Sequence, residues 1–170
     1  MSKQIKHQRT NKFGNTFQAG GSIIKNYLQE ILSMSINLKQ KAFYFWILQN
    51  GKSFGALKHI PNEKINKILS TYRYGGTKKQ CFFNSQLSSL NSPLQYYEGW
   101  YVTELPIVIE HGWNVYKGEV VDFTAHHNKI KVREYFGIHI PENFIREKLV
   151  ETGMSCSYLQ HYFYEKIYKG

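Results

Sequence analysis

Residues 111–124, with the sequence HGWNVYKGEVVDFT, decide the fold of this chain. Aromatic and β-branched residues lie on both sides of Lys117-Gly118, a pair typical of tight turns, so the stretch predicts a β-hairpin. The same signature recurs before and after the hairpin. It predicts a mostly antiparallel sheet with strands over residues 96–102, 107–116, 119–124 and 132–138.

The hairpin has two plausible registers. A loop at 117–118 places Trp113 opposite Asp122, and a loop at 116–117 places His111 opposite Asp122. In both registers His111 and Asp122 lie on the same face, as direct or diagonal neighbours, because side chains alternate along a strand. A three-residue loop would separate them, so the shorter turns predict a histidine beside a carboxylate.

Apolar residues at helical spacing predict helices around this sheet. Their ranges are 22 to about 30 or 32, 38–48, 61–71, Cys81 to before Pro93, and 142–151 with Gly153 as its stop. The aromatic tail, 158–168, fits either a strand or a helix. Helices followed by an antiparallel sheet make the fold class α+β, with a helical N-terminal part packed on a Cys-bearing helix and the sheet.

The chain has 170 residues, a length typical of one domain, and 42% of them are hydrophobic. This composition excludes a wholly disordered or collagen-like chain. No apolar run approaches the roughly 20 residues of a membrane span, and no secretory signal is visible. We therefore expect a cytoplasmic protein, with secretion by an unconventional signal as the alternative.

The net charge of +10 is unevenly distributed. Residues 1–79 hold 14 Lys and Arg against two Glu, a net charge of +12, and residues 80–170 carry a net charge of −2. The basic half could contact nucleic acid or an acidic partner. The basic residues are nevertheless scattered, so solvated lysine with only weak polyanion contact is the favoured interpretation.

Cys81 follows a glycine-bearing loop and begins a predicted helix. The free N–H groups of a helix N-terminus favour thiolate over thiol, and the thiolate is the nucleophilic form. Gln80 and the first helical N–H groups then become candidate oxyanion donors. A small core residue is the alternative interpretation of Cys81, and Cys156 has no acid or base pattern near it.

Asp122 is the only aspartate in the chain, and aspartate is depleted in strands. The residue could simply end its strand. A partnership with His111 is the better explanation, because a carboxylate orients an imidazole and stabilises its protonated form. Zinc bound by Cys81, His111 and Asp122 is the competing chemistry, but Cys-x-x-Cys and His-x-x-x-His spacings are missing, and we expect no metal or cofactor.

These residues resemble the core of the transglutaminase-like, papain-related cysteine fold. That core has a helix-borne Cys, then a His-small-Trp-x-Val strand, then a Gly-x-Val-x-Asp-x-Thr strand. Small bacterial and phage relatives add Cys-x-x-Asn, Tyr-x-Glu-Gly and Tyr-Phe-Gly motifs, here at 81–84, 96–99 and 135–137. The resemblance covers about residues 78–140.

The resemblance implies Cys81 as nucleophile, His111 as general base and acid, and Asp122 as orienting carboxylate. Candidates for oxyanion or substrate-lining positions are Gln80, Asn84, Glu98 and Trp113. Two of them have an alternative role: Glu98 could bond a backbone amide, and Trp113 could be a core residue. The sequence departs from the family at Gly112, where Ala is usual, and at Phe123, where Pro is usual.

The implied function is cysteine-dependent acyl chemistry on a peptide, protein or small amide or ester substrate, by hydrolysis or by transfer through a thioester. The alternative is a non-catalytic binding module that uses the basic N-terminal half. The domain organisation follows from the same residues. We expect a flexible basic leader at 1–21 and a single α+β catalytic domain at 22–170, with its core at 78–140.

Overall fold

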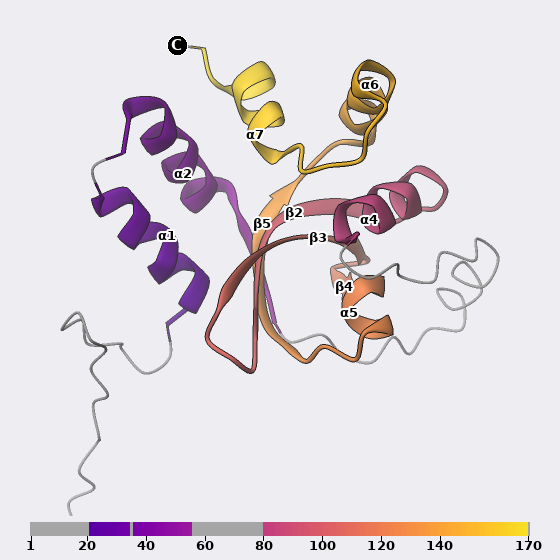
Figure 1. The fold of residues 1–170 in the computed structure, drawn as a ribbon, viewed down its shortest axis with the longest axis horizontal. Coiled ribbons are helices and arrows are strands. Elements are labelled where there is room, and N and C mark those ends of the chain that lie inside the picture. Colours follow the sequence, from indigo (N-terminus) through magenta and orange to yellow (C-terminus); the bar gives the residue numbers. More distant parts are fainter. Residues whose placement is uncertain (1–20, 35, 56–79, 170) are drawn as a thin grey trace, which may run out of the picture.

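The computed structural model describes residues 21–34, 36–55 and 80–169. Within these ranges the strands are β1 (Lys52–Phe54), β2 (Gln95–Thr103), β3 (Val108–Tyr116), β4 (Glu119–Val121) and β5 (Val132–His139). They form one curled sheet in the order β1-β5-β2-β3-β4, and every neighbouring pair is antiparallel (Figure 1). The fold is mixed α+β, as the sequence predicts.

Helices surround this sheet. They are α1 (Ile23–Ser33), α2 (Leu38–Asn50), α4 (Cys81–Leu90), α5 (Phe123–His127), α6 (Glu142–Thr152) and α7 (Leu159–Tyr162), followed by a π-helical turn, η1 (Phe163–Ile167). The tail that fitted strand or helix is therefore helical. Gly153 ends α6 with a left-handed φ of 66°. The helix predicted over 61–71 and the leader predicted at 1–21 lie outside the described residues, except for residue 21.

The strand predicted over 119–124 is wrong at its end. β4 stops at Val121, and the short helix α5 begins at Phe123. The reason is Asp122, whose Oδ1 accepts the backbone N–H of Ala125 at 2.9 Å and so caps the first turn of a helix. The three-residue strand β1 was also missed, since it is too short to show a periodic pattern.

The two faces of the sheet bury different clusters. Tyr96, Trp100 and Val102 on β2 belong to the larger core, together with apolar residues of α1, α2, α6 and α7. Tyr97 and Tyr101 alternate with them and pack on the opposite face in an aromatic cluster that includes residues of β1, β3, β5 and α5. The curled sheet thus has two separate apolar faces, and both are buried.

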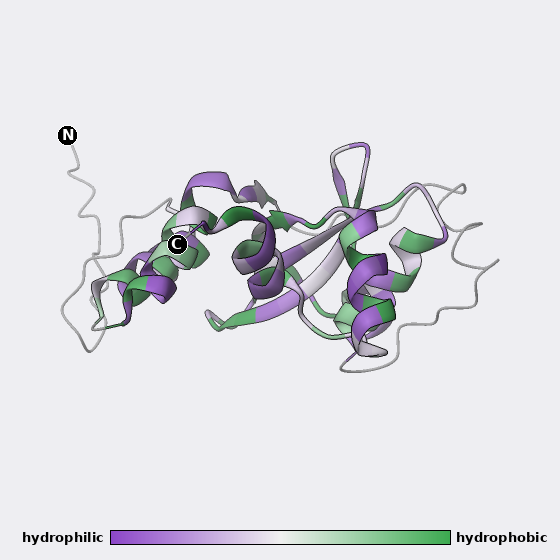
Figure 2. Cartoon of the chain, turned by 90° about the horizontal axis from the view of Figure 1, so that it is seen from above, coloured by the Kyte–Doolittle hydropathy of each residue, from purple (hydrophilic) through white to green (hydrophobic). Residues whose placement is uncertain are grey.

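The N-terminal helices are fixed by capping groups and by the sheet. The hydroxyl of Ser22 and the N–H groups of Ile23 and Ile24 donate to the carboxylate of Glu134 on β5. Both α1 and α2 pack against β5, whereas α4 packs mainly on β3. The prediction that the N-terminal helices pack on the Cys-bearing helix is therefore corrected: α1 and α2 pack on the sheet, on the opposite side of the fold from α4 (Figure 1). Figure 2 shows that these helices carry both apolar and polar bands.

Candidate functional site

Cys81 is the first residue of α4. Gln80 is the N-cap residue, is exposed, and makes no side-chain capping hydrogen bond. The side chain of Cys81 is half-buried and makes a hydrogen bond with the side chain of His111. The helix start, which the sequence located, therefore puts the thiol next to the imidazole of a strand 30 residues further along the chain.

The surroundings of Cys81 favour its thiolate. Burial by itself raises the pKa of the thiol, but the hydrogen bond and charge of His111 lower it. Backbone hydrogen bonds with Gly112 and Phe82 lower the pKa further, and the net result is a pKa below the ordinary value. The other cysteine differs, because burial and the nearby charge of Glu98 raise the pKa of Cys156.

His111 is buried on β3 and contacts a carboxylate. Its Nε2 lies 2.7 Å from Oδ2 of Asp122, which leaves Nδ1 as the ring nitrogen for the thiol of Cys81. Burial by itself lowers the pKa of His111, but the charge and hydrogen bond of Asp122, and then Cys81, raise it to about 9. The imidazole is therefore protonated at neutral pH and pairs with both neighbours.

Asp122 has no exposed surface, and each of its oxygens accepts hydrogen bonds. Oδ2 accepts from His111 and, at 3.0 Å, from the hydroxyl of Tyr135, while Oδ1 caps α5. Burial raises the pKa of Asp122, but the charge of His111 and these hydrogen bonds outweigh it and keep the pKa low. The single aspartate thus both ends its strand and binds the histidine, which combines the two interpretations of the sequence.

The β3–β4 register shows how the pair forms. Tyr116 pairs with Glu119 and Asn114 with Val121, so the loop is Lys117-Gly118, whose φ angles of 49° and 86° are those of a tight left-handed turn. Of the two predicted registers the structure has the one that makes His111 and Asp122 diagonal neighbours. β4 pairs only with residues 114–116 of β3 and ends before it reaches His111.

Aromatic rings hold the imidazole in place. The ring of Tyr101 meets that of His111 edge-on at a centroid distance of 4.3 Å. Trp113 lies parallel to the imidazole at 6.5 Å and is completely buried in the aromatic cluster of this face of the sheet. Tyr101 and Tyr135 were not predicted as site residues. Tyr135 lies in the Tyr-Phe-Gly segment, but only the fold brings β5 within reach of Asp122.

Asn84 and Glu98 are both buried and both hydrogen-bonded. The side-chain N–H of Asn84 donates to the hydroxyl of Thr124 at 3.0 Å, which ties α4 to α5 behind the thiol. Glu98 accepts from the hydroxyl of Tyr96 and from backbone N–H groups at the start of α7, at 2.6–2.9 Å. Glu98 therefore bonds backbone amides and also lines a cavity beside α4.

Gly112 lies where the structure leaves little room for a side chain. A Cβ atom on Gly112 would lie 3.0 Å from a ring carbon of Phe82 and 3.1 Å from the hydroxyl oxygen of Tyr96. Both distances are shorter than ordinary van der Waals contact. The space that an alanine methyl group at position 112 would occupy is therefore filled by Phe82, the residue after Cys81, and by Tyr96, which donates to Glu98.

Two other properties of the described ranges bear on function. Their helices include none long and apolar enough to cross a membrane. They also contain no group of three His, Cys, Asp or Glu side chains that could hold a metal ion.

Comparison of the chain with protein-family models, with curated proteins and with solved structures gives no match. The resemblance to the transglutaminase-like fold therefore rests on the motifs alone.

Proposed function

We propose that this protein catalyses cysteine-dependent acyl chemistry, the hydrolysis or transfer of an amide or ester through a thioester on Cys81. The observation that carries this proposal is the chain of hydrogen bonds from Cys81 through His111 to Asp122. Its members come from a helix start, a strand and a strand end, and their pKa shifts favour a thiolate–imidazolium pair. A helix-borne cysteine on an antiparallel sheet also agrees with the transglutaminase-like and papain-like resemblance.

In the first half-reaction the thiolate of Cys81 attacks the carbonyl carbon of the substrate and forms the C–S bond. The imidazolium of His111 gives its proton to the leaving amine or alcohol as the C–N or C–O bond breaks. The carboxylate of Asp122 keeps the imidazole oriented and stabilises its positive charge. The carbonyl oxygen becomes negative in this step and needs donors, for which the backbone N–H groups near Cys81 and the side chain of Gln80 are candidates.

In the second half-reaction water or an amine attacks the thioester carbonyl. The neutral imidazole of His111 takes the proton of this nucleophile, the C–S bond breaks, and the thiolate of Cys81 is restored. Water yields a carboxylic acid and completes hydrolysis. An amine yields a new amide and completes transfer.

Acyl-enzyme capture tests the proposal directly. Full-length protein is incubated with a panel of activated esters and peptide thioesters, and intact-mass and peptide mass spectrometry locate any adduct. We expect a thioester on Cys81, cleaved by hydroxylamine, and none on Cys156. The Cys81→Ala variant should form no adduct and the Cys156→Ala variant should behave like the wild type. Adducts confined to lysine, or no adduct with any reagent, would refute an acyl-enzyme mechanism.

A further inference from the structure

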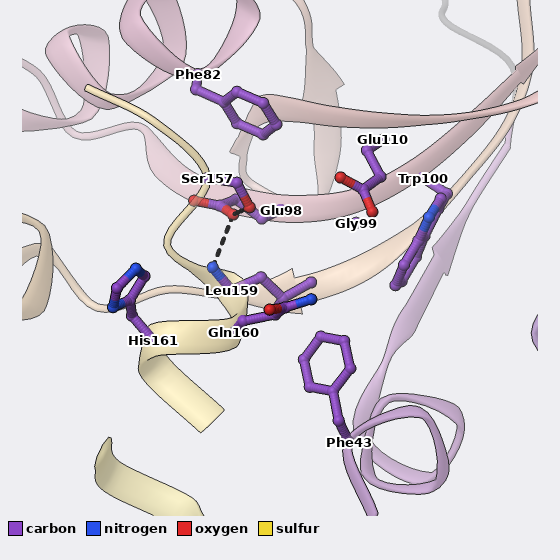
Figure 3. Close-up of a pocket in the computed structure, with 10 residues that line it drawn as sticks. All are labelled: Phe43, Phe82, Glu98, Gly99, Trp100, Glu110, Ser157, Leu159, Gln160 and His161. Carbon is purple, nitrogen blue, oxygen red and sulfur yellow. Dashed lines mark hydrogen bonds between the residues drawn. The ribbon is translucent and has the colours of Figure 1, made fainter. Parts of the chain in front are cut away.

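Tyr101 lies on the same face of the sheet as His111. Gly99 pairs with His111 across β2 and β3, so Tyr101, two residues further along β2, is a diagonal neighbour of the histidine. Glu98 and Trp100 alternate with Tyr101 and line a cavity of about 270 Å³ on the other face (Figure 3). Tyr101 therefore belongs to the thiol–imidazole side of the sheet, where its ring meets the imidazole at a centroid distance of 4.3 Å.

The phenol of Tyr101 lies near both ends of the hydrogen-bonded chain of Cys81, His111 and Asp122. Burial raises the pKa of Tyr101 most, and the charges of Asp122 and then of Cys81 raise it further. The hydroxyl is therefore protonated at neutral pH, and it is a hydrogen-bond donor.

This donor is unused within the part of the chain that the structure describes. The aromatic cluster on this face contains two other tyrosines for comparison. Tyr135 donates to Asp122, and the pKa of Tyr97 is raised by burial alone, with no charge of the site acting on it. The hydroxyl of Tyr101 makes no hydrogen bond with a described residue, and it is not among the fully buried polar atoms that lack a partner. Tyr101 therefore offers the site a donor that is not sealed from solvent.

Attack of a thiolate on a carbonyl group creates a negatively charged oxygen on the carbon that binds the sulfur. Donors that are already in position stabilise this oxyanion, and each typically contributes a factor of about 10²–10³ to kcat. We propose that Tyr101 is a further catalytic residue, whose hydroxyl donates a hydrogen bond to the oxyanion formed when Cys81 attacks its substrate. The inference rests on the proposed function, and it adds a side-chain donor from β2 to the backbone N–H groups near Cys81.

The phenol keeps its proton throughout this step. As the C–S bond forms, the electron pair of the C=O double bond moves onto the oxygen, which accepts the hydrogen bond of Tyr101. The pair returns when the C–N or C–O bond breaks and the leaving group departs with the proton of His111. Tyr101 thus stabilises the intermediate without taking the role of His111 as acid or base.

Two reactions of the same thiol test this role. p-Nitrophenyl acetate acylates a thiolate through a tetrahedral oxyanion, whereas iodoacetamide alkylates it at a saturated carbon, where no oxyanion forms. Tyr101→Phe keeps the ring against His111 and removes only the hydroxyl. We expect this variant to acylate Cys81 about a hundredfold more slowly than the wild type and to alkylate it at a rate within about twofold. Peptide mass spectrometry of timed samples of the full-length protein measures both rates.

Tyr97→Phe is the matched control. It removes a phenol hydroxyl from the same strand, the same face and the same aromatic cluster, at a position where no charge of the site acts. Both rates at Cys81 should equal those of the wild type in this variant.

The outcomes separate the two proposals. Equal acylation of the wild type and Tyr101→Phe would overturn the donor role and leave the nucleophile intact. A parallel decrease in acylation and alkylation would also overturn it, because the phenol would then act through His111 and not on the oxyanion. If wild-type Cys81 is alkylated but is acylated by no ester or thioester, the proposed function itself fails, and the role of Tyr101 fails with it.

Discussion

Nε2 of His111 lies 2.7 Å from Oδ2 of Asp122, although the two residues are not direct partners in the sheet. They are brought together by the two-residue loop at 117–118 and by the end of β4 at Val121. The same carboxylate caps α5 and accepts a hydrogen bond from Tyr135. One buried group therefore fixes the hairpin, a helix start and the orientation of the imidazole.

Cys81 should be the more reactive thiol. Its pKa is lowered below the ordinary thiol value, whereas that of Cys156 is raised, so at pH 7 we expect iodoacetamide to alkylate Cys81 at least about tenfold faster. Site-resolved mass spectrometry of timed samples measures both rates in one experiment. His111→Asn should reduce the rate at Cys81 alone. Similar rates at both cysteines of the folded protein would contradict an activated thiol.

Asp122→Asn should keep the fold and lose activity. Asparagine can still accept the N–H of Ala125, but it removes the charge beside His111 and favours the wrong tautomer of the imidazole. We expect kcat to decrease by roughly a thousandfold or more on any substrate found by acyl capture. Tyr135→Phe removes one hydrogen bond from the same carboxylate and keeps its charge, so it should lower kcat by less than about tenfold. Unchanged turnover in folded Asp122→Asn would remove the carboxylate from the mechanism.

The His111–Asp122 pair should make stability depend on pH. The folded protein raises the pKa of His111 from 6.5 to about 9, so it retains a proton that the unfolded chain loses. This stabilisation is complete below pH 6.5 and disappears as pH rises through about 9. The loss is of the order of 3 kcal/mol, because each pKa unit corresponds to about 1.4 kcal/mol.

Urea unfolding at several pH values in a Cys81→Ser background, which removes the titrating thiol, measures this decrease. Adding His111→Asn to that background should abolish the difference between pH 6.5 and 9. If the free energy of unfolding still decreases by the same amount, another group is responsible.

Gly112→Ala should destabilise the protein. Its methyl group would meet Phe82 and the hydroxyl of Tyr96 at 3.0 and 3.1 Å, so we expect a loss of about 1–2 kcal/mol in the free energy of unfolding. Displacement of Phe82 should also change the alkylation rate of the adjacent Cys81. Gly55→Ala is the matched control, because its added methyl group meets nothing within 4 Å. Equal free energies of unfolding for the two variants would contradict the expected steric clash at position 112.

The basic N-terminal half should bind polyanions only weakly. Residues 1–79 carry a net charge of +12, but the basic residues are dispersed, and we expect binding to DNA and RNA to be similar and to vanish at physiological salt. Fluorescence anisotropy at low and physiological salt, with and without residues 1–21, measures this. Tight, sequence-selective binding that survives physiological salt would favour a binding module, particularly if Cys81→Ala binds equally well.

Local rules made much of this site predictable. A turn pair between β-branched stretches defines a hairpin, and the strict alternation of side chains places His111 and Asp122 on one face in either short register. A loop followed by a helical pattern locates the start of α4, and hence Cys81. These inferences need only neighbouring residues, because the periods of strand and helix are fixed by backbone geometry.

The sequence by itself therefore determined the hairpin, the strands 96–102 and 132–138, the helix start at Cys81 and the pairing of a histidine with the only aspartate. The tertiary structure decided which register the hairpin takes, that α5 interrupts the last strand, and that β5 lies between β1 and β2 and brings Tyr135 to Asp122. It also decided that Trp113 is buried in the aromatic cluster and that Glu98 is buried and hydrogen-bonded to the start of α7. These features depend on contacts between residues far apart in the chain. Such contacts are stabilised by burial and hydrogen bonding, and they produce no periodic pattern in the sequence.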